Sequence, residues 1–164
     1  MIRQASFSQD RRHRYTLFRR WADDETAPLL WILLNPSIAD ERIDDPTIRR
    51  CIRFSAGFGF SAMRLLNIFA WRSTDPAGLA QTDDPVGPLN DAVILDGATT
   101  SPLIVCAWGV HGDNWGRAAR VLELLRPYDR KLRCLGRTKS GAPRHPLYLA
   151  SDTPLEDFDS CARS

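Results

Sequence analysis

The chain has 164 residues, of which 43% are hydrophobic and 26% charged, and its formal net charge is +2. This composition is typical of one ordinary globular domain, and no apolar run approaches the ~20 residues that a membrane-spanning helix needs. The mild charge excludes a strongly basic protein, so composition alone does not indicate nucleic-acid binding. We expect one domain over residues 1–164, loosely ordered at residues 1–12 and 152–164.

The N-terminal residues and the cysteines indicate the compartment. Charged residues follow Met1 at once, without the apolar centre of a secretory signal, so we expect a cytoplasmic protein. The cysteines Cys51, Cys106, Cys134 and Cys161 form no Cys-x-x-Cys pair, and three of them lie in apolar runs. A reduced cysteine in such a run packs as a small hydrophobe. We therefore expect no metal and no cofactor.

The first half of the chain predicts two strands and a helix. Residues 15–21 contain good strand formers among arginines and predict a short edge strand. Residues 29–34 are a continuous apolar run stopped by Asn35-Pro36, which is typical of a central strand buried on both faces. Asp45 then supplies a helix N-cap and Pro46 the first helical position, so a helix is expected to run to Gly57 or Gly59.

The second half alternates strands and helices. We expect strands at residues 63–70, 103–108 and 131–135, and helices at residues 89–98 and from a cap at Asp113-Asn114 to residue 125. Alternating elements imply right-handed crossovers and a parallel sheet covered on both sides. The sequence therefore predicts an α/β fold: a three-layer α/β/α sandwich with a mostly parallel, four-stranded central sheet.

Polar residues follow all four predicted central strands. Because the carboxyl ends of parallel strands meet at one edge of a sheet, these residues are expected to share one pocket for a nucleobase-like or other small polar ligand. In chain order they are Asn35, Ser37, Asp40, Asn67, Trp71, Arg72, His111, Lys139, His145 and Tyr148.

Each of these residues also has a structural explanation. Asn35 before Pro36 suffices to end a strand, and the amide of Asn67 in an apolar strand needs partners or costs roughly 1–3 kcal/mol. His111 and His145 either serve the pocket or brace loops. Lys139 either binds an anion or is solvated, and its segment lacks the spacing of a P-loop. Ser37 is outside a Gly-x-Ser-x-Gly motif, which disfavours an α/β-hydrolase nucleophile.

Two arginine-rich segments leave a further alternative open. They form a face for phosphates or a solvated face with local ion pairs. The clustered residues are Arg11, Arg12, Arg14, Arg19, Arg20, Arg49, Arg50 and Arg53.

Five motifs occur in order along the chain: Asn35-Pro36-Ser37, Asp45-Pro46-Thr47, Asn67-Ile68-Phe69-Ala70, Trp108-Gly109-Val110-His111-Gly112 and His145-Pro146-Leu147-Tyr148. Together they resemble the domain-of-unknown-function family 1643, and the resemblance covers residues 12–150.

The order of these motifs is also similar, more distantly, to the uracil-DNA glycosylase superfamily. The resemblance implies a fold of that kind, in which Asn35 positions a water against the sugar C1′, Asn67 binds the base edge and His145 stabilises charge on the leaving base. Leu147 and Ser37 depart from the superfamily pattern.

Two functions are compatible with these residues. The first is a nucleobase-recognising hydrolase of N-glycosidic bonds, with Asn35 and His145 catalytic. In it, Asn67, Ser37, Asp40, Trp71, His111 and Tyr148 bind the base or ligand, and Lys139 and Arg72 bind phosphate. The alternative is a non-catalytic module that binds a nucleotide, DNA or RNA in the same pocket. The sequence does not separate the two, nor does it indicate the oligomeric state.

Overall fold

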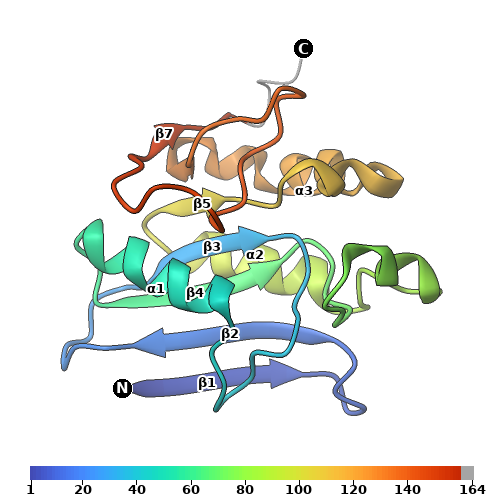
Figure 1. The fold of residues 1–164 in the computed structure, drawn as a ribbon, viewed down its shortest axis with the longest axis horizontal. Coiled ribbons are helices and arrows are strands. Elements are labelled where there is room, and N and C mark those ends of the chain that lie inside the picture. The colour runs from blue at the N-terminus through green and yellow to red at the C-terminus, as the bar shows by residue number, and fades with distance from the viewer. Residues whose placement is uncertain (160–164) are drawn as a thin grey trace.

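One mixed sheet of seven strands forms the centre of the molecule. The computed structural model describes residues 1–159. In those residues the strands lie in the order β1-β2-β4-β3-β5-β6-β7 (Figure 1). The strands are β1 Ile2–Phe7, β2 Arg14–Arg20, β3 Leu29–Leu33, β4 Ala62–Asn67, β5 Ile104–Cys106, β6 Leu132–Cys134 and β7 Glu156–Asp157. The helices are α1 Pro46–Gly57, α2 Asn90–Thr100 and α3 Arg117–Leu125, with 3-10 segments η1 Pro76–Gln81, η2 Val110–Gly116 and η3 Arg126–Lys131.

The four central strands β4, β3, β5 and β6 are parallel to one another. The hairpin of β1 and β2 extends the sheet on one side, and β7 extends it on the other, each in antiparallel pairing. The predicted α/β class is confirmed. The sheet has seven strands and not the four of the predicted central sheet, because these three antiparallel strands enlarge it.

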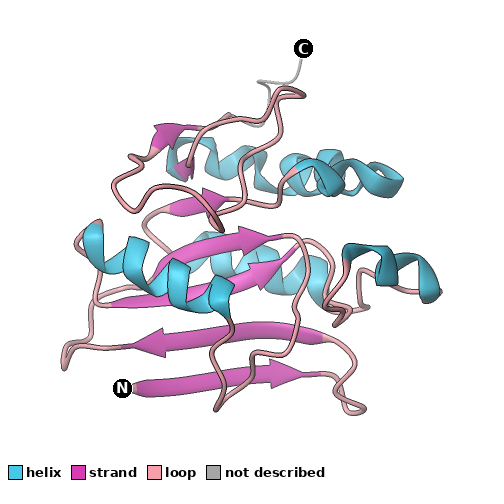
Figure 2. Cartoon of the chain, viewed as in Figure 1, coloured by secondary structure: helices cyan, strands magenta, loops and turns pink. Residues whose placement is uncertain are grey.

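Helices cover both faces of the sheet, which explains the continuous apolar run of β3. Leu29, Trp31 and Leu33 point into the core under α1, whereas Leu30 and Ile32 point into the core under α2 and α3. Figure 2 shows α1 in front of the sheet and α2 behind it. Because successive side chains of a strand point to opposite faces, burial on both faces requires an apolar residue at every position.

Two predicted elements differ from the structure. The strand expected at the sheet edge is β2, and it is internal, because Ile2–Phe7 pairs with it as β1 although that segment was expected to be loosely ordered. The prediction of a helix cap at Asp113-Asn114 is wrong. Asn114 has non-helical backbone angles, and α3 begins only after Gly116.

The described residues also bear on the predicted packing of the cysteines. Cys51, Cys106 and Cys134 are buried and unpaired, so their predicted core packing is confirmed. Cys161 and the rest of 160–164, part of the end expected to be loosely ordered, lie outside the described residues. Within residues 1–159, no helix is long and apolar enough to cross a membrane, and no three metal-ligating side chains gather.

Candidate functional site

The loops after β3 and β4 are joined by Asn35. Its side-chain nitrogen donates to the carbonyl oxygen of Ser73 at 2.8 Å and to that of Pro36 at 3.2 Å, and the backbone N–H of Ser73 donates to Pro36 at 2.8 Å. These bonds fix the orientation of the amide, because its nitrogen is the donor. The side-chain oxygen of Asn35 therefore remains as an acceptor for a ligand or a water.

Asn67 is the last residue of β4 and is paired in register with Leu33 of β3. Its side chain is 2% exposed, and Oδ1 accepts a hydrogen bond from Nη2 of Arg14 at 3.2 Å. Nδ2 of Asn90 donates to the backbone oxygen of Asn67 at 2.8 Å and holds the strand end in place. Because Oδ1 is engaged, the amide nitrogen of Asn67 is the group available to a ligand, and it is a donor.

His145 is fixed by contacts between the loops after β5 and β6. The N–H of Gly109 donates to the carbonyl of Pro143 at 2.8 Å, and the N–H of Leu147 donates to Nδ1 of His145 at 3.2 Å. A neutral imidazole whose Nδ1 accepts carries its proton on Nε2. Burial lowers the pKa of His145 below 6.5, against an opposing effect of the Asp45 carboxylate. His145 is therefore a neutral Nε2–H donor at neutral pH.

These three residues line one small cavity, here called the inner cavity, of about 50 Å³. A water molecule occupies about 30 Å³ in the liquid, so the inner cavity has room for a water or for one exocyclic group of a ligand. Its walls are Arg14, Leu33, Asn35, Pro36, Ser37, Asp45, Thr47, Ile48, Leu65, Asn67 and His145.

A larger cavity, the outer cavity, adjoins it and has a volume of about 390 Å³. Asn35, Ser37, Thr47 and His145 belong to both. The size lies within the range of small-molecule sites, and the wall is largely apolar on one side. The outer cavity is lined by Leu34, Asn35, Ser37, Thr47, Ser73, Thr74, Pro76, Trp108, Gly109, Val110, His111, His145 and Leu147.

Two glycines allow the loop after β5 to form the wall around Trp108. Gly109 has a φ of 71°, a conformation that glycine adopts without strain. A Cβ atom at Gly112 would collide with the indole ring of Trp108, so the chain can cross the ring only without a side chain there. Trp108 is thereby covered by the loop and is 1% exposed.

Sequence reasoning missed two charged residues of the inner cavity, Arg14 and Asp45. Arg14 is 2% exposed, donates to the carbonyl of Ala39 at 3.0 Å, and has no hydrogen-bond partner at Nε among the described residues. Burial lowers its pKa to about 10, partly opposed by the charge of Asp45. Asp45 is 8% exposed, and its Oδ1 caps α1 by accepting from the N–H of Ile48 at 2.9 Å.

Arg14 and Asp45 bring opposite charges to the same cavity without forming an ion pair with each other. In the sequence, Arg14 is one of several arginines in a basic cluster, and only its tertiary contacts distinguish it from the solvated members of that cluster. Asp45 could have been singled out as a site residue because it lies in the Asp45-Pro46-Thr47 motif. Its predicted role as a helix cap, however, already explained the aspartate.

A third depression, here called the arginine groove, shares Ser37, Ser73 and Thr74 with the outer cavity. It has a volume of about 410 Å³ and is lined by Arg11, Arg12, Ser37, Ile38, Trp71, Arg72, Ser73 and Thr74. Nε of Arg72 donates to the carbonyl of Ser37 at 3.2 Å, and Arg11 pairs with Glu41 at 3.0 Å. Trp71 thus lies in this groove and lines neither cavity.

Three predicted site residues lie outside both cavities and outside the arginine groove. Oδ1 of Asp40 accepts from the N–H groups of Arg42 and Ile43 at 2.7 and 2.8 Å; these bonds lower the pKa of Asp40 and form a turn. Lys139 is exposed and lines neither cavity. Tyr148 is 94% exposed. His111, in contrast, lines the outer cavity.

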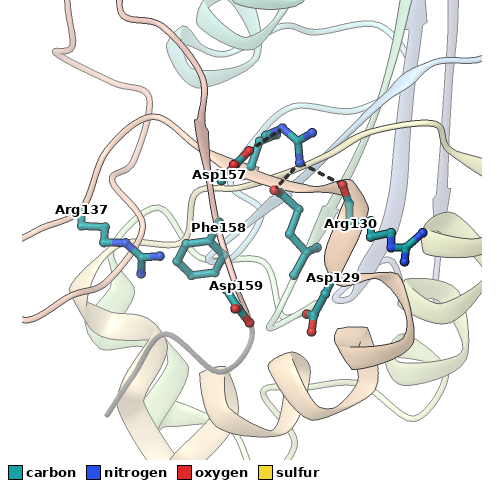
Figure 3. A pocket seen from close by; sticks show the side chains of 8 residues that line it. Asp129, Arg130, Arg137, Asp157, Phe158 and Asp159 are labelled. Atoms are coloured by element: carbon teal, nitrogen blue, oxygen red, sulfur yellow. Dashed lines mark hydrogen bonds and ion pairs between the residues drawn. The ribbon is translucent and has the colours of Figure 1, made fainter.

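A pocket beside β6 and β7 contains none of the predicted site residues (Figure 3). There Nε of Arg133 pairs with Asp157 at 3.3 Å, and the guanidinium of Arg137 lies 4.5 Å from the ring centre of Phe158. Seven of the ten predicted site residues therefore line the two adjoining cavities or the arginine groove, and none lines this pocket. The seven are Asn35, Ser37, Asn67, Trp71, Arg72, His111 and His145.

Comparison with known proteins gives one match. The family described as "Protein of unknown function (DUF1643)" matches residues 14–147, which confirms the resemblance to that family drawn from the motifs. No curated protein and no solved structure matches the chain.

Proposed function

This chain belongs to the DUF1643 family, and we propose that it is a nucleobase-recognising hydrolase of N-glycosidic bonds. The observation that carries the proposal is the orientation of three side chains around the inner cavity. Asn35 offers an acceptor, while Asn67 and His145 offer donors, and each orientation is fixed by a hydrogen bond to the surrounding protein. The parallel core with helices on both faces supports a fold similar to that of uracil-DNA glycosylases.

The two cavities divide the ligand between them. A base and its sugar suit the outer cavity, where Val110 and Leu147 offer apolar side chains to the ligand. The inner cavity, at about 50 Å³, admits only the edge of the base. There the base meets the donors of Asn67 and Arg14, so an oxygen or an unprotonated ring nitrogen is favoured at that edge.

Each polar group has a role in cleavage. Asn35 Oδ1 orients a water toward C1′ of the sugar, and Asn67 binds the base. His145 donates from Nε2 to the base as negative charge develops on it. Its lowered pKa keeps the ring neutral, so it donates a hydrogen bond without bringing a buried charge into the ground state.

The arginine groove supports a ligand that carries phosphate. The groove continues from the outer cavity across Ser37, Ser73 and Thr74. Neither Arg12 nor Arg72 has a described carboxylate within ion-pair distance, so both keep uncompensated charge. Arginines that border a base site attract the phosphate of a nucleotide or of a nucleic-acid strand.

One observation favours the alternative of a non-catalytic binding module. Asn35, Asn67 and the Nε2–H form of His145 orient and donate, but none of them accepts a proton from water. A site with only these groups lacks a proton acceptor for the attacking water, which suits a module that binds a base without cleaving its bond.

Incubation of the wild-type protein with defined substrates separates the two functions. The substrates are nucleosides, nucleoside monophosphates, and DNA and RNA oligonucleotides with natural or deaminated bases, and mass spectrometry measures any free base. Release of a base that exceeds the protein concentration supports the hydrolase. Binding without release would support the module.

A further inference from the structure

We propose that Asp45 is the proton acceptor of the hydrolytic reaction. This inference rests on the proposed hydrolase function and supplies the base that the three predicted residues lack. Asp45 is the only carboxylate among the residues that line the inner cavity, and it shares that cavity with Asn35 and His145. A volume of about 50 Å³ confines these groups to the surroundings of one or two water molecules.

The position of Asp45 is fixed by α1. Its Oδ1 accepts from the N–H of Ile48 at 2.9 Å, and the backbone there is extended, as an N-cap residue requires. The capping bond holds one oxygen and leaves the second oxygen of the carboxylate for the cavity. The position is therefore held by secondary structure instead of by a mobile loop, which suits a group that must meet a water in one geometry.

Arg14 is the charged side chain that shares the inner cavity with Asp45. Arg14 and His145 line the same cavity, and Cys51 packs on the neighbouring turn of α1 as a buried, un-ionised thiol. Arg14 stays protonated at neutral pH and supplies positive charge without an ion pair. An ion pair would occupy the carboxylate oxygens, whereas this arrangement compensates the charge and keeps an oxygen accessible.

The reaction balances with water as the only co-reactant. Asn35 Oδ1 accepts one hydrogen bond from the water, and Asp45 takes the other proton as the O–H bond breaks. The new O–C1′ bond forms as the C1′–N bond breaks, and the electron pair of the C1′–N bond leaves with the base. His145 Nε2–H and the donors of Arg14 and Asn67 stabilise that charge until the base is protonated. Asp45 then releases its proton to solvent.

Asp45→Asn tests this role without removing the helix cap, because asparagine caps helices as well as aspartate does. Asp75→Asn is the matched control: Asp75 also precedes a proline, caps η1 through the N–H of Ala77 and lines neither cavity. The probes are nucleoside monophosphates and oligonucleotides that contain one deaminated base. Asp45→Asn is expected to lower kcat about 100-fold or more, the effect of losing a general base, with Kd changed less than about threefold. Asp75→Asn is expected to match the wild type.

A second variant distinguishes a proton acceptor from a residue that only shapes the cavity. Asp45→Ala opens space beside the water, and added formate is expected to restore part of kcat there but not in Asp45→Asn, whose side chain fills the space. Turnover of Asp45→Asn within about fivefold of the wild type would overturn the role of Asp45 and leave the hydrolase intact. Wild-type protein that binds the probes without releasing a base would overturn the hydrolase itself, and Asp45 with it.

Discussion

Replacement of Arg14 by methionine tests whether this arginine serves ligand binding or only the stability of the fold. Arg14 is 2% exposed and makes two hydrogen bonds, to Ala39 at 3.0 Å and to Asn67 at 3.2 Å. Arg19, on the same strand β2, is equally buried but pairs with Asp44 at 2.8 Å. Methionine follows the same unbranched path in either position without a charge. The two arginines therefore form a matched pair for one experiment.

The structure gives opposing terms of similar size for Arg14. Burial lowers its pKa from 12.5 to about 10, which corresponds to about 3 kcal/mol against the charged form. Removal of the charge recovers this cost. It also loses two hydrogen bonds from a charged donor, each contributing about 1.5–3 kcal/mol. The net loss in the free energy of unfolding is expected to be about 1–2 kcal/mol. Arg19→Met should cost about 3–5 kcal/mol, because it removes an ion pair and four hydrogen bonds from the Arg19 guanidinium to backbone carbonyls.

Urea unfolding followed by tryptophan fluorescence measures both losses, and calorimetric titration with nucleoside monophosphates measures affinity below the unfolding range. Arg14→Met is expected to lower affinity about 10-fold to 100-fold, the effect of one charge-assisted hydrogen bond to the base edge. Arg19→Met is expected to keep the affinity of the folded protein. An Arg14→Met variant as destabilised as Arg19→Met, with unchanged affinity, would show that Arg14 is structural and refute the reasoning.

Three further predictions concern the predicted site residues and the arginine groove. Asn35→Ala is expected to lower turnover about 100-fold with affinity nearly unchanged, since orienting water acts in the transition state, whereas Asn67→Ala should weaken binding about 10-fold. If Asn35→Ala and Asn67→Ala weaken binding equally in calorimetric titration, with no separate loss of turnover, the result would favour the binding module. The wild type is expected to lose stability as pH falls from about 6.5 through the lowered pKa of His145, because the unfolded chain binds the proton first; His145→Gln should lose less between pH 7.5 and 5.5 in urea unfolding. Arg12→Ala is expected to reduce the slope of log affinity against log salt by about 0.7–0.9 for an oligonucleotide, and affinity insensitive to salt would indicate a solvated face.

The elements predicted best from sequence are those whose signals are local. The apolar run that ends before Asn35 predicts a strand buried on both faces, because such a run must be covered on both sides whichever elements cover it. The strand β3 is buried in this way. Asp45-Pro46 predicts the start of α1 because a cap and a fixed φ act within one turn. Both signals are complete within about five residues.

Elements defined by distant partners were not predictable in the same way. Ile2–Phe7 begins with three exposed residues and has no clear apolar alternation, so its sequence does not distinguish it from a loosely ordered end. Its strand conformation comes from backbone pairing with β2, from Ile2 opposite Arg20 to Phe7 opposite Arg14. The internal place of β2 depends on that same pairing, and a single-sequence pattern contains no information on register between strands.

The residues of the site also fall into those with a local signal and those placed by distant partners. This difference explains why the two charged residues were missed. Asn35, Asn67 and His145 follow parallel strands, so topology alone brings them to one edge. Arg14 reaches the inner cavity from an antiparallel strand outside the parallel core, and Asp45 reaches it from the first turn of α1. The charge of Asp45 opposes the effect of burial on Arg14, although the two side chains form no ion pair and Nε of Arg14 has no hydrogen-bond partner among the described residues. A ligand that meets both charges is the reason we propose for the pair, and the Arg14→Met and Asp45→Asn variants test it.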